Sequence, residues 1–174
     1  LLERGYAALH AAGTSKAGLL GAVVGVGVGQ WQSEFGSVLL GTPAGRSVYA
    51  STGFSCSVTC GRVSFVLGLQ GPCASYDTAC SASLVGNHAN VRALQRLECE
   101  SALSAGVNMI LDPAVMRGNS IAGFTSVLGR SHTFDARADG YARGEAIEAL
   151  ACRLRRGAAA EASVQMLGSS VRQD

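Results

Sequence analysis

The chain has 174 residues, enough for one ordinary domain, and its 48% apolar residues and mean hydropathy of +0.25 exclude an intrinsically disordered protein. Its formal charge of +2 comes from 14 basic and 12 acidic residues spread along the sequence, which gives no argument for nucleic-acid binding. The apolar run at residues 21–29 is far shorter than the roughly 20 residues of a membrane-spanning helix, and no other run reaches that length, so no membrane association is expected.

Glycine and cysteine usage indicates a sheet-containing fold with free thiols. The 23 glycines and 3 prolines suit closely packed backbone, and the 6% aromatic content leaves Ala, Val and Leu to fill the core. The six cysteines lie inside predicted helices and strands, and the sequence shows no secretory leader. We therefore expect reduced cysteines in an intracellular compartment, cytoplasmic or organellar.

The first half of the chain predicts alternating helices and strands. Residues 1–12 have near-helical apolar spacing without an N-cap, and residues 22–28 form a valine-rich run typical of a buried strand. The glycines of that run lie within the strand and lack the GxGxxG spacing, so a dinucleotide site is not predicted. We expect a polar loop over residues 29–41, a buried helix over 55–67 and then a strand that ends at Cys80.

The second half continues the alternation. From Ser81 a helix is predicted whose apolar residues fall mostly on one face: Leu84, Val85, Val91, Leu94 and Leu97. Strands are expected over residues 101–107, 145–153 and 164–171, and a short helix over 113–120, capped by Asp112 and opened by Pro113. Residues 158–160 form a small, flexible-looking alanine tract.

Cys80 is the most informative single residue, because it lies where a predicted strand turns into a predicted helix. Unpaired backbone N–H groups and the positive end of the helix dipole meet there, which favours a thiolate and hence a nucleophile. The alternative from the residues alone is a small buried hydrophobic side chain, as most free cysteines are.

Five separated stretches in this order resemble the β-ketoacyl synthase (ketosynthase) domain of type I-like polyketide synthases. They are Gly61-Arg62-Val63-Ser64-Phe65, Gly68-Leu69-Gln70-Gly71-Pro72, Asp77-Thr78-Ala79-Cys80-Ser81-Ala82-Ser83-Leu84-Val85, Gly106-Val107-Asn108, and Thr133-Phe134-Asp135-Ala136 with Asp139-Gly140-Tyr141-Ala142-Arg143-Gly144-Glu145. The resemblance extends over essentially the whole chain.

The resemblance implies an α/β, thiolase-like fold of mixed sheets layered with helices. Residues 1–174 would form part of such a domain, mainly its N-terminal half with the start of the following region, truncated at both ends. By the same resemblance Cys80 accepts an acyl group, which then condenses with a malonyl-type unit by a decarboxylative Claisen reaction. The small residues around Cys80 leave room for a pantetheine arm, and its own N–H would help form an oxyanion hole.

The partners implied by the resemblance are acyl and malonyl-type thioesters on the phosphopantetheine of an acyl carrier protein. No directly bound cofactor, no metal, no nucleic acid and no membrane is expected. The family is dimeric, and residues 73–78 would pair near the two-fold axis of a homodimer of the intact domain.

The two histidine motifs of the family, one of them HGTGT-like, do not occur in these residues. His88 and His132 lack the required context and are interpreted as structural. We therefore expect the 174-residue fragment alone to lack condensing activity. Cys56 and Cys60 are interpreted as core residues rather than zinc ligands.

The acidic and basic residues near the end of the resemblance have a structural interpretation as well. Asp135, Asp139, Arg143 and Glu145 are expected to form ion pairs and turn caps near the active site. Ala146 stands where the family usually has glycine.

Two alternatives are kept. A fatty-acid β-ketoacyl-ACP synthase performs the same chemistry, and a non-catalytic ketosynthase-like subunit for dimerisation or chain-length control shares the fold. Such subunits typically replace the nucleophile, whereas Cys80 is intact. A thiolase or a chalcone-synthase-like enzyme would not be expected to combine the DTACS, TFDA and DGYxRGE stretches.

Overall fold

The computed structural model describes residues 1–154 and 164–173, which divide into two units. The first unit comprises Leu1–Trp31, Cys56–Val107 and Ile147–Asp174. The second comprises Gln32–Ser55 and Asn108–Ala146. Each unit is therefore assembled from segments that are distant in the sequence.

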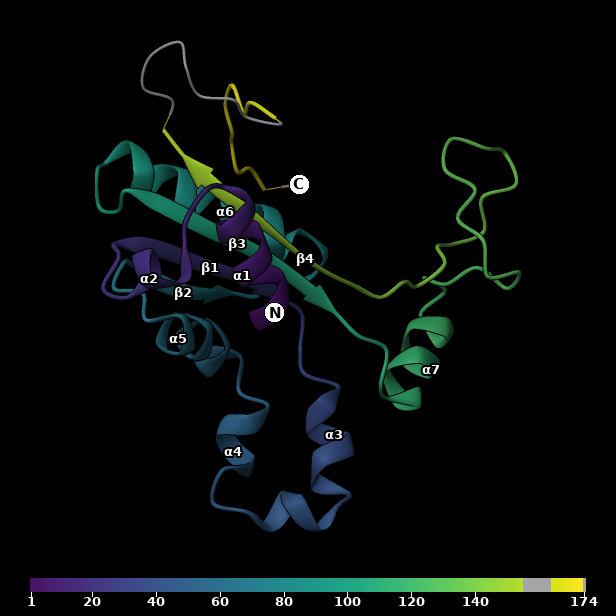
Figure 1. Ribbon diagram of the computed structural model, residues 1–174. Helices are drawn as coiled ribbons and strands as arrows, with labels where there is room; N and C mark the ends of the chain where they lie inside the picture. The colour runs from purple at the N-terminus through teal and green to yellow at the C-terminus, as the bar shows by residue number, and fades with distance from the viewer. Residues whose placement is uncertain (155–163, 174) are drawn as a thin grey trace. The chain divides into compact units, whose positions relative to one another are not determined.

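A four-stranded sheet with the order β2-β1-β3-β4 forms the centre of the first unit. Its strands are β1 (Val24–Gln30), β2 (Cys73–Tyr76), β3 (Ser101–Asn108) and β4 (Ala146–Arg153). Strand β1 is parallel to both β2 and β3, and the arrow of β4 points opposite to that of β3 (Figure 1). The sheet is therefore mixed, as predicted for this α/β chain.

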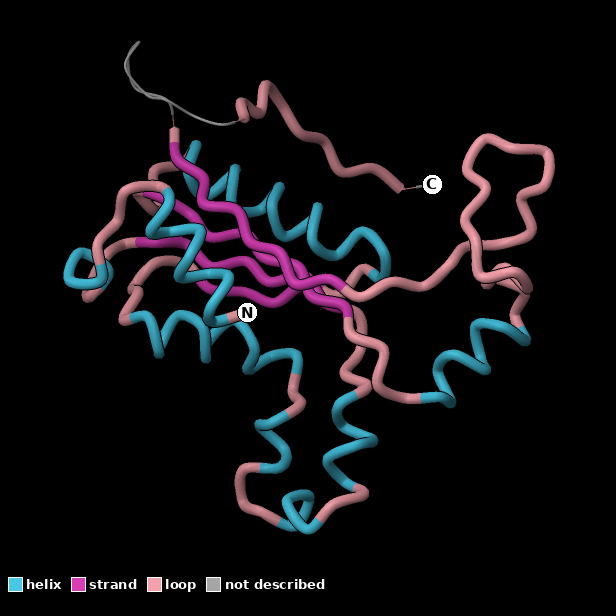
Figure 2. Tube along the Cα trace, turned by 45° about the vertical axis from the view of Figure 1, so that its right-hand side comes forward, coloured by secondary structure: helices cyan, strands magenta, loops and turns pink. Residues whose placement is uncertain are grey.

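Helices cover both faces of this sheet, with α5 and α6 on opposite sides of the strands (Figure 2). The helices of the unit are α1 (Leu2–Ala11), α2 (Lys16–Leu19), α5 (Cys56–Leu67) and α6 (Ala82–Gln95). Leu9 of α1 and Val63 of α5 join the core on one face, and Ala93 and Leu94 of α6 pack against Ala102 on the other. Helix α1 begins without a side-chain cap, which confirms the prediction.

Strand β1 explains why the two faces differ. All seven of its residues are buried, and its valines Val24, Val26 and Val28 belong to the core shared with α1 and α5. Because side chains alternate across a strand, the intervening glycines Gly25 and Gly27 face α6. A Cβ added to Gly27 would lie 2.8 Å from Nδ2 of Asn90 in α6. The alternating glycines therefore allow α6 to approach the sheet backbone.

The predicted apolar stripe on the helix after Ser81 is correct only in part, since Leu94 is buried and Val85 and Val91 are half-buried. Leu84 and Leu97 are 72% and 68% exposed. The buried face of α6 consists mostly of small and amide side chains: Ala82, Gly86, Asn87, Asn90, Ala93 and Leu94. Large apolar side chains do not fit between a helix and a sheet that approach this closely.

The second unit carries short helices. They are α3 (Phe35–Leu40), the 3₁₀ helix η1 (Pro43–Arg46), α4 (Ala50–Gly53) and α7 (Pro113–Ile121). The predicted loop over 29–41 is therefore wrong, since it is partly strand β1 and partly helix α3. Helix α7 confirms its predicted start, because the Asp112 carboxylate accepts a hydrogen bond of 2.8 Å from the Ala114 N–H.

Other boundaries also differ from expectation. Strand β2 ends at Tyr76, four residues before Cys80. The strand expected over 164–171 does not form; this segment contacts α6 through side chains, including the His88 ring nitrogen Nδ1, which lies 2.8 Å from Oγ of Ser169. The alanine tract at 158–160 lies outside the described residues. Helix α5 was predicted to be buried, but its Phe65 is 86% exposed.

No helix within residues 1–154 and 164–173 is long and apolar enough to cross a membrane.

Candidate active site

A five-residue turn, residues 77–81, joins the end of β2 to α6. The carboxylate of Asp77 accepts a hydrogen bond of 3.2 Å from the Ala79 N–H. The hydroxyls of Thr78 and Ser81 lie 2.9 Å apart, and the Ser81 hydroxyl also donates to the Thr78 carbonyl at 2.9 Å. These local bonds hold the turn that presents Cys80.

Ala79, directly before Cys80, adopts a left-handed backbone conformation with a φ of 53°. For an L-residue other than glycine this conformation costs on the order of 1 kcal/mol. The backbone is therefore strained at Ala79, the first residue of the short 3₁₀ helix η2 (Ala79–Ser81). The positive φ of this alanine had no sequence signal.

Cys80 lies in η2, immediately before α6, and is exposed. The 14-residue helix α6 receives no side-chain cap at Ser81. The N–H groups of a first helical turn have no acceptor within the helix, and the helix dipole favours negative charge there. The predicted placement of Cys80 at a helix start is confirmed, and the alternative of a buried hydrophobic side chain is wrong.

The other cysteines have different surroundings, and all six are free. Cys60 and Cys99 are buried, as a core role for Cys60 predicts. Burial raises the pKa of the Cys99 and Cys152 thiols. Although Cys73 is exposed as a whole residue, desolvation of its thiol, with a smaller contribution from the neighbouring Cys60 thiol, raises its pKa to about 12. Because the thiolate is the nucleophilic form, Cys99, Cys152 and Cys73 are poor nucleophiles at neutral pH.

A buried polar network fixes α6 on the sheet. Nδ2 of Asn90 donates to the Leu103 carbonyl at 3.0 Å and to Oγ of Ser104 at 2.9 Å. The Ser104 hydroxyl in turn donates to Oδ1 of Asn87 at 2.9 Å. Because each member has a partner, the network is stable in the interior and defines one position of α6 along β3.

The histidines have structural contacts. His88 is half-buried on α6, with its ring nitrogen bonded to Ser169 as described above. The His132 carbonyl accepts a hydrogen bond of 3.1 Å from the Asp135 N–H, and the His10 ring lies 5.9 Å from that of Tyr6. The ring contact supports the structural interpretation of His88, whereas the contact of His132 is made by its backbone, so its structural role stays a prediction.

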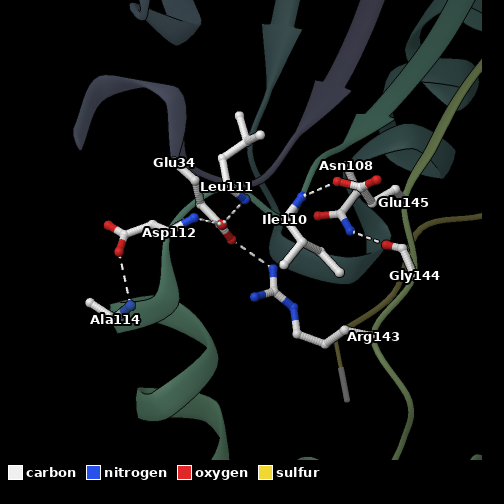
Figure 3. Close-up of polar contacts among 9 residues, drawn as sticks. All are labelled: Glu34, Asn108, Ile110, Leu111, Asp112, Ala114, Arg143, Gly144 and Glu145. Carbon is white, nitrogen blue, oxygen red and sulfur yellow. Dashed lines mark hydrogen bonds and ion pairs between the residues drawn. The ribbon is translucent and has the colours of Figure 1, made fainter. Parts of the chain in front are cut away.

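A buried ion pair lies at the centre of the second unit (Figure 3). Oε1 of Glu34 accepts a hydrogen bond of 2.7 Å from Arg143, and their side chains are 6% and 5% exposed. Oε2 of Glu34 accepts from the N–H groups of Leu111 and Asp112 at 2.7 and 2.8 Å. Burial raises the pKa of Glu34, but the bonds from Arg143, Asp112 and Leu111 outweigh it and lower the pKa below its ordinary value.

The neighbouring charged residues also have structural partners. The Glu145 carboxylate accepts a hydrogen bond of 2.8 Å from the Ile110 N–H, and the Asn108 amide donates to the Gly144 carbonyl (Figure 3). Asp135 forms an exposed ion pair of 2.7 Å with Arg137. The predicted ion pairs and caps are thus confirmed for Arg143, Glu145 and Asp135. Glu34 was missed, because it lies 109 residues from Arg143 and in a predicted loop.

Comparison with known proteins covers most of the chain. A family model described as "Beta-ketoacyl synthase, N-terminal domain" matches residues 1–152. A phenolphthiocerol/phthiocerol polyketide synthase of Mycobacterium tuberculosis is 41% identical over 145 residues, which are 83% of this chain and 9% of that protein. The highly reducing polyketide synthase 40 of Fusarium pseudograminearum is 41% identical over 144 residues, 83% of this chain and 6% of that protein.

Solved structures give the same picture. The ketosynthase from module 6 of the bacillaene synthase of Bacillus subtilis 168 superposes with a TM-score of 0.77 at 34% identity, covering 86% of this chain and 24% of that one. The oxazolomycin ketosynthase domain of Streptomyces albus JA3453 superposes with a TM-score of 0.71 at 32% identity, covering 88% and 27%. The chain thus spans about a quarter of these ketosynthase structures and less than a tenth of the curated relatives.

Proposed function

The chain belongs to the beta-ketoacyl synthase family, and on that premise we propose that it carries the nucleophile, Cys80, of a condensing enzyme in polyketide biosynthesis. The observation that carries this proposal is the exposed Cys80 thiol in a tightly bonded turn at the start of α6. The relatives named above are polyketide synthases, which favours this pathway over fatty-acid synthesis.

In the first step, the Cys80 sulfur attacks the carbonyl carbon of an acyl thioester. A bond forms between that carbon and Sγ, the bond to the carrier's sulfur breaks, and the proton of the Cys80 thiol ends on the released carrier thiol. Exchange between two thioesters is nearly thermoneutral, so the acyl group can be accepted and later released. Backbone N–H groups at the helix start are suited to stabilise the oxyanion that forms on the carbonyl oxygen.

In the second step, a malonyl-type thioester loses carbon dioxide, and the resulting carbanion attacks the acyl-Cys80 carbonyl. The new carbon–carbon bond replaces the bond to Sγ, and the released Cys80 thiolate takes up a proton from solvent. The two histidine motifs that assist this step in the family do not occur in these 174 residues. We therefore assign only the acyl-transfer half of the reaction to the described residues.

The substrates of this reaction would arrive on the phosphopantetheine arm of an acyl carrier protein. No residue is assigned to a resident cofactor or metal. Residues 1–174 would form part of a larger ketosynthase domain, since the chain spans 24% and 27% of the two solved ketosynthases.

The edge strand β2 supports a homodimer of the intact domain. Among the described residues, the order β2-β1-β3-β4 gives it a neighbour on one side only, and Cys73 at its start is exposed. A free strand edge offers unpaired N–H and C=O groups to a second strand. Residues 73–78 of two copies would pair there, and sedimentation of the intact domain as a monomer would contradict this.

Acyl loading tests the assignment directly. The full-length protein is incubated with a radiolabelled acyl carrier protein, and the label bound to the ketosynthase is measured after acid quenching. Cys80→Ala should abolish loading. Cys152→Ala is the matched control and should load normally, because burial raises the pKa of its thiol and disfavours the thiolate. Retention of the label by Cys80→Ala would contradict the proposal.

A further inference from the structure

We propose that Gly29 and Gly106 form a seat for the first turn of α6, and that Gly106 is a positioning residue for acyl transfer. The seat consists of these two glycines and of Ser83, which rests on them. The proposal rests on Cys80 being the nucleophile. It assigns a role to residues that do not contact the reacting atoms.

The two glycines are neighbours on adjacent parallel strands. Gly29 of β1 is paired with Gly106 of β3. A Cβ on Gly29 would overlap the backbone of Ala82 and Ser83, and a Cβ on Gly106 would lie 2.8 Å from Cβ of Ser83. Real Cβ atoms essentially never approach this closely, so a side chain at either position would displace the helix. Ser83 follows Cys80 by three residues, which is less than one helical turn.

Conformational freedom does not explain these glycines. Neither has a positive φ, and both lie within regular strands. The absence of a side chain is therefore what the position requires. The first turn of α6 rests directly on strand backbone at this point, which leaves it no room to move toward the sheet.

A second anchor determines which end of the helix would move. Asn90, two turns after Ser83, is held by its bonds to Leu103 and Ser104. A methyl group at position 106 would therefore displace mainly the N-terminal end of α6, which carries Cys80. Reacting groups that are misplaced by about 1 Å can lose about 100-fold in rate.

The test compares three variants of the full-length protein. Gly106→Ala introduces the contact with Ser83. The double variant Gly106→Ala with Ser83→Gly removes the Cβ that would be struck. Gly61→Ala on α5 is the control, because a Cβ there meets nothing within 4 Å. Two rates are measured: single-turnover acyl loading, and alkylation of Cys80 by iodoacetamide, followed by mass spectrometry as a function of pH.

We expect Gly106→Ala to slow loading by about 10- to 100-fold and to change the alkylation profile of Cys80, with Gly61→Ala unchanged. The double variant should recover most of the loading rate. Purely structural destabilisation would lower the amount of folded protein but leave the alkylation profile of Cys80 in the folded fraction unchanged, so a changed profile identifies the positioning role. If Gly106→Ala fails to fold, the loading rate and the Cys80 alkylation profile of the double variant are compared with those of the wild type instead.

Normal loading by Gly106→Ala, or no recovery in the double variant, would overturn the positioning role. The wild type and Cys80→Ala are measured in parallel, so that the two proposals fail separately. A labelled acyl group bound to Cys80→Ala would contradict the assignment of Cys80 as the nucleophile. Loss of label on Cys80→Ala together with normal loading by Gly106→Ala would contradict only the positioning role of Gly106.

Discussion

At the scale of single residues, Ala79 shows how the turn before Cys80 is strained. Its left-handed φ of 53° places a methyl group where glycine would have none. The bonds from Asp77, Thr78 and Ser81 hold this conformation in place. Strain that neighbouring bonds maintain next to a reactive group is typical of functional turns.

Ala79→Gly should therefore stabilise the folded protein by up to about 1 kcal/mol, less the extra entropy that glycine gives the unfolded chain. The matched control, Ala89→Gly within α6, should instead destabilise by about 1 kcal/mol, because its helix interior favours alanine. Urea unfolding of the complete domain measures both. Equal losses from the two substitutions would show that the strain at Ala79 is negligible.

The Glu34 carboxylate makes the free energy of unfolding depend on pH. Its pKa is lowered in the folded state, so its contribution is fully present above its unfolded value of about 4.5 and is lost as the pH falls through the lower folded value. Glu34→Gln should destabilise by about 3 kcal/mol at pH 7, because it leaves Arg143 buried without its counter-charge.

The difference between wild type and Glu34→Gln should shrink when unfolding is measured below pH 4.5 rather than at pH 7. Asp135→Asn, which breaks the exposed pair with Arg137, serves as the control and should have a much smaller effect. A pH-independent difference for Glu34→Gln would contradict the ion-pair account.

At the scale of elements, the network between α6 and β3 makes Asn90 a structural anchor. Asn90→Ala removes two hydrogen bonds in the interior and should destabilise by about 2 kcal/mol. Asn119→Ala on α7 is a fair control, since Asn119 is also buried but its Nδ2 has no partner among the described residues. Thermal melting compares the two, and a loss at Asn119 as large as at Asn90 would argue against the anchor.

The elements also show what sequence patterns can predict. Strands β1 and β3 were predicted because valine-rich or small apolar runs mark buried parallel strands, and α7 because Asp112 and Pro113 mark its start. The buried face of α6 was predicted wrongly, because it depends on glycines of β1 that lie more than fifty residues earlier. Helix α3 was missed because its six residues, Phe35–Leu40, are too few for a helical periodicity to show.

The candidate site divides in the same way. Cys80 and its helix start could be predicted, since both are local features of one stretch. The Glu34–Arg143 pair and the Gly29–Gly106 seat could not, because each joins segments that only the tertiary fold brings together. Local patterns therefore predicted where Cys80 lies, and they did not predict the long-range contacts within either unit.

At the scale of the whole molecule, the described residues expose many large apolar side chains. Those at least 75% exposed are Leu20, Val48, Tyr49, Phe65, Ile121, Val127, Leu128, Phe134, Val164 and Leu167. Apolar surface of this extent marks interaction sites or a tendency to aggregate. It agrees with the proposal that these residues are part of a larger domain.

The purified 174-residue chain should show no turnover of acyl and malonyl carrier proteins, because the two histidine motifs of the family do not occur in it. It should also bind a hydrophobic dye more strongly, per residue, than the full-length protein does. The full-length protein is the control for both measurements. Turnover by the isolated chain would contradict the assignment of the remaining chemistry to other residues.

The parallel pairing of β1 has a consequence for how the protein is made. Val24 is opposite Ser101, and Val26 is opposite Cys73, so β1 leaves the ribosome well before either neighbour exists. Long-range pairing of this kind is slow, and unpaired apolar strands invite wrong partners while they wait. The valine–glycine strand at the centre of the sheet is thus the segment most dependent on protection during synthesis, until residue 108 has emerged.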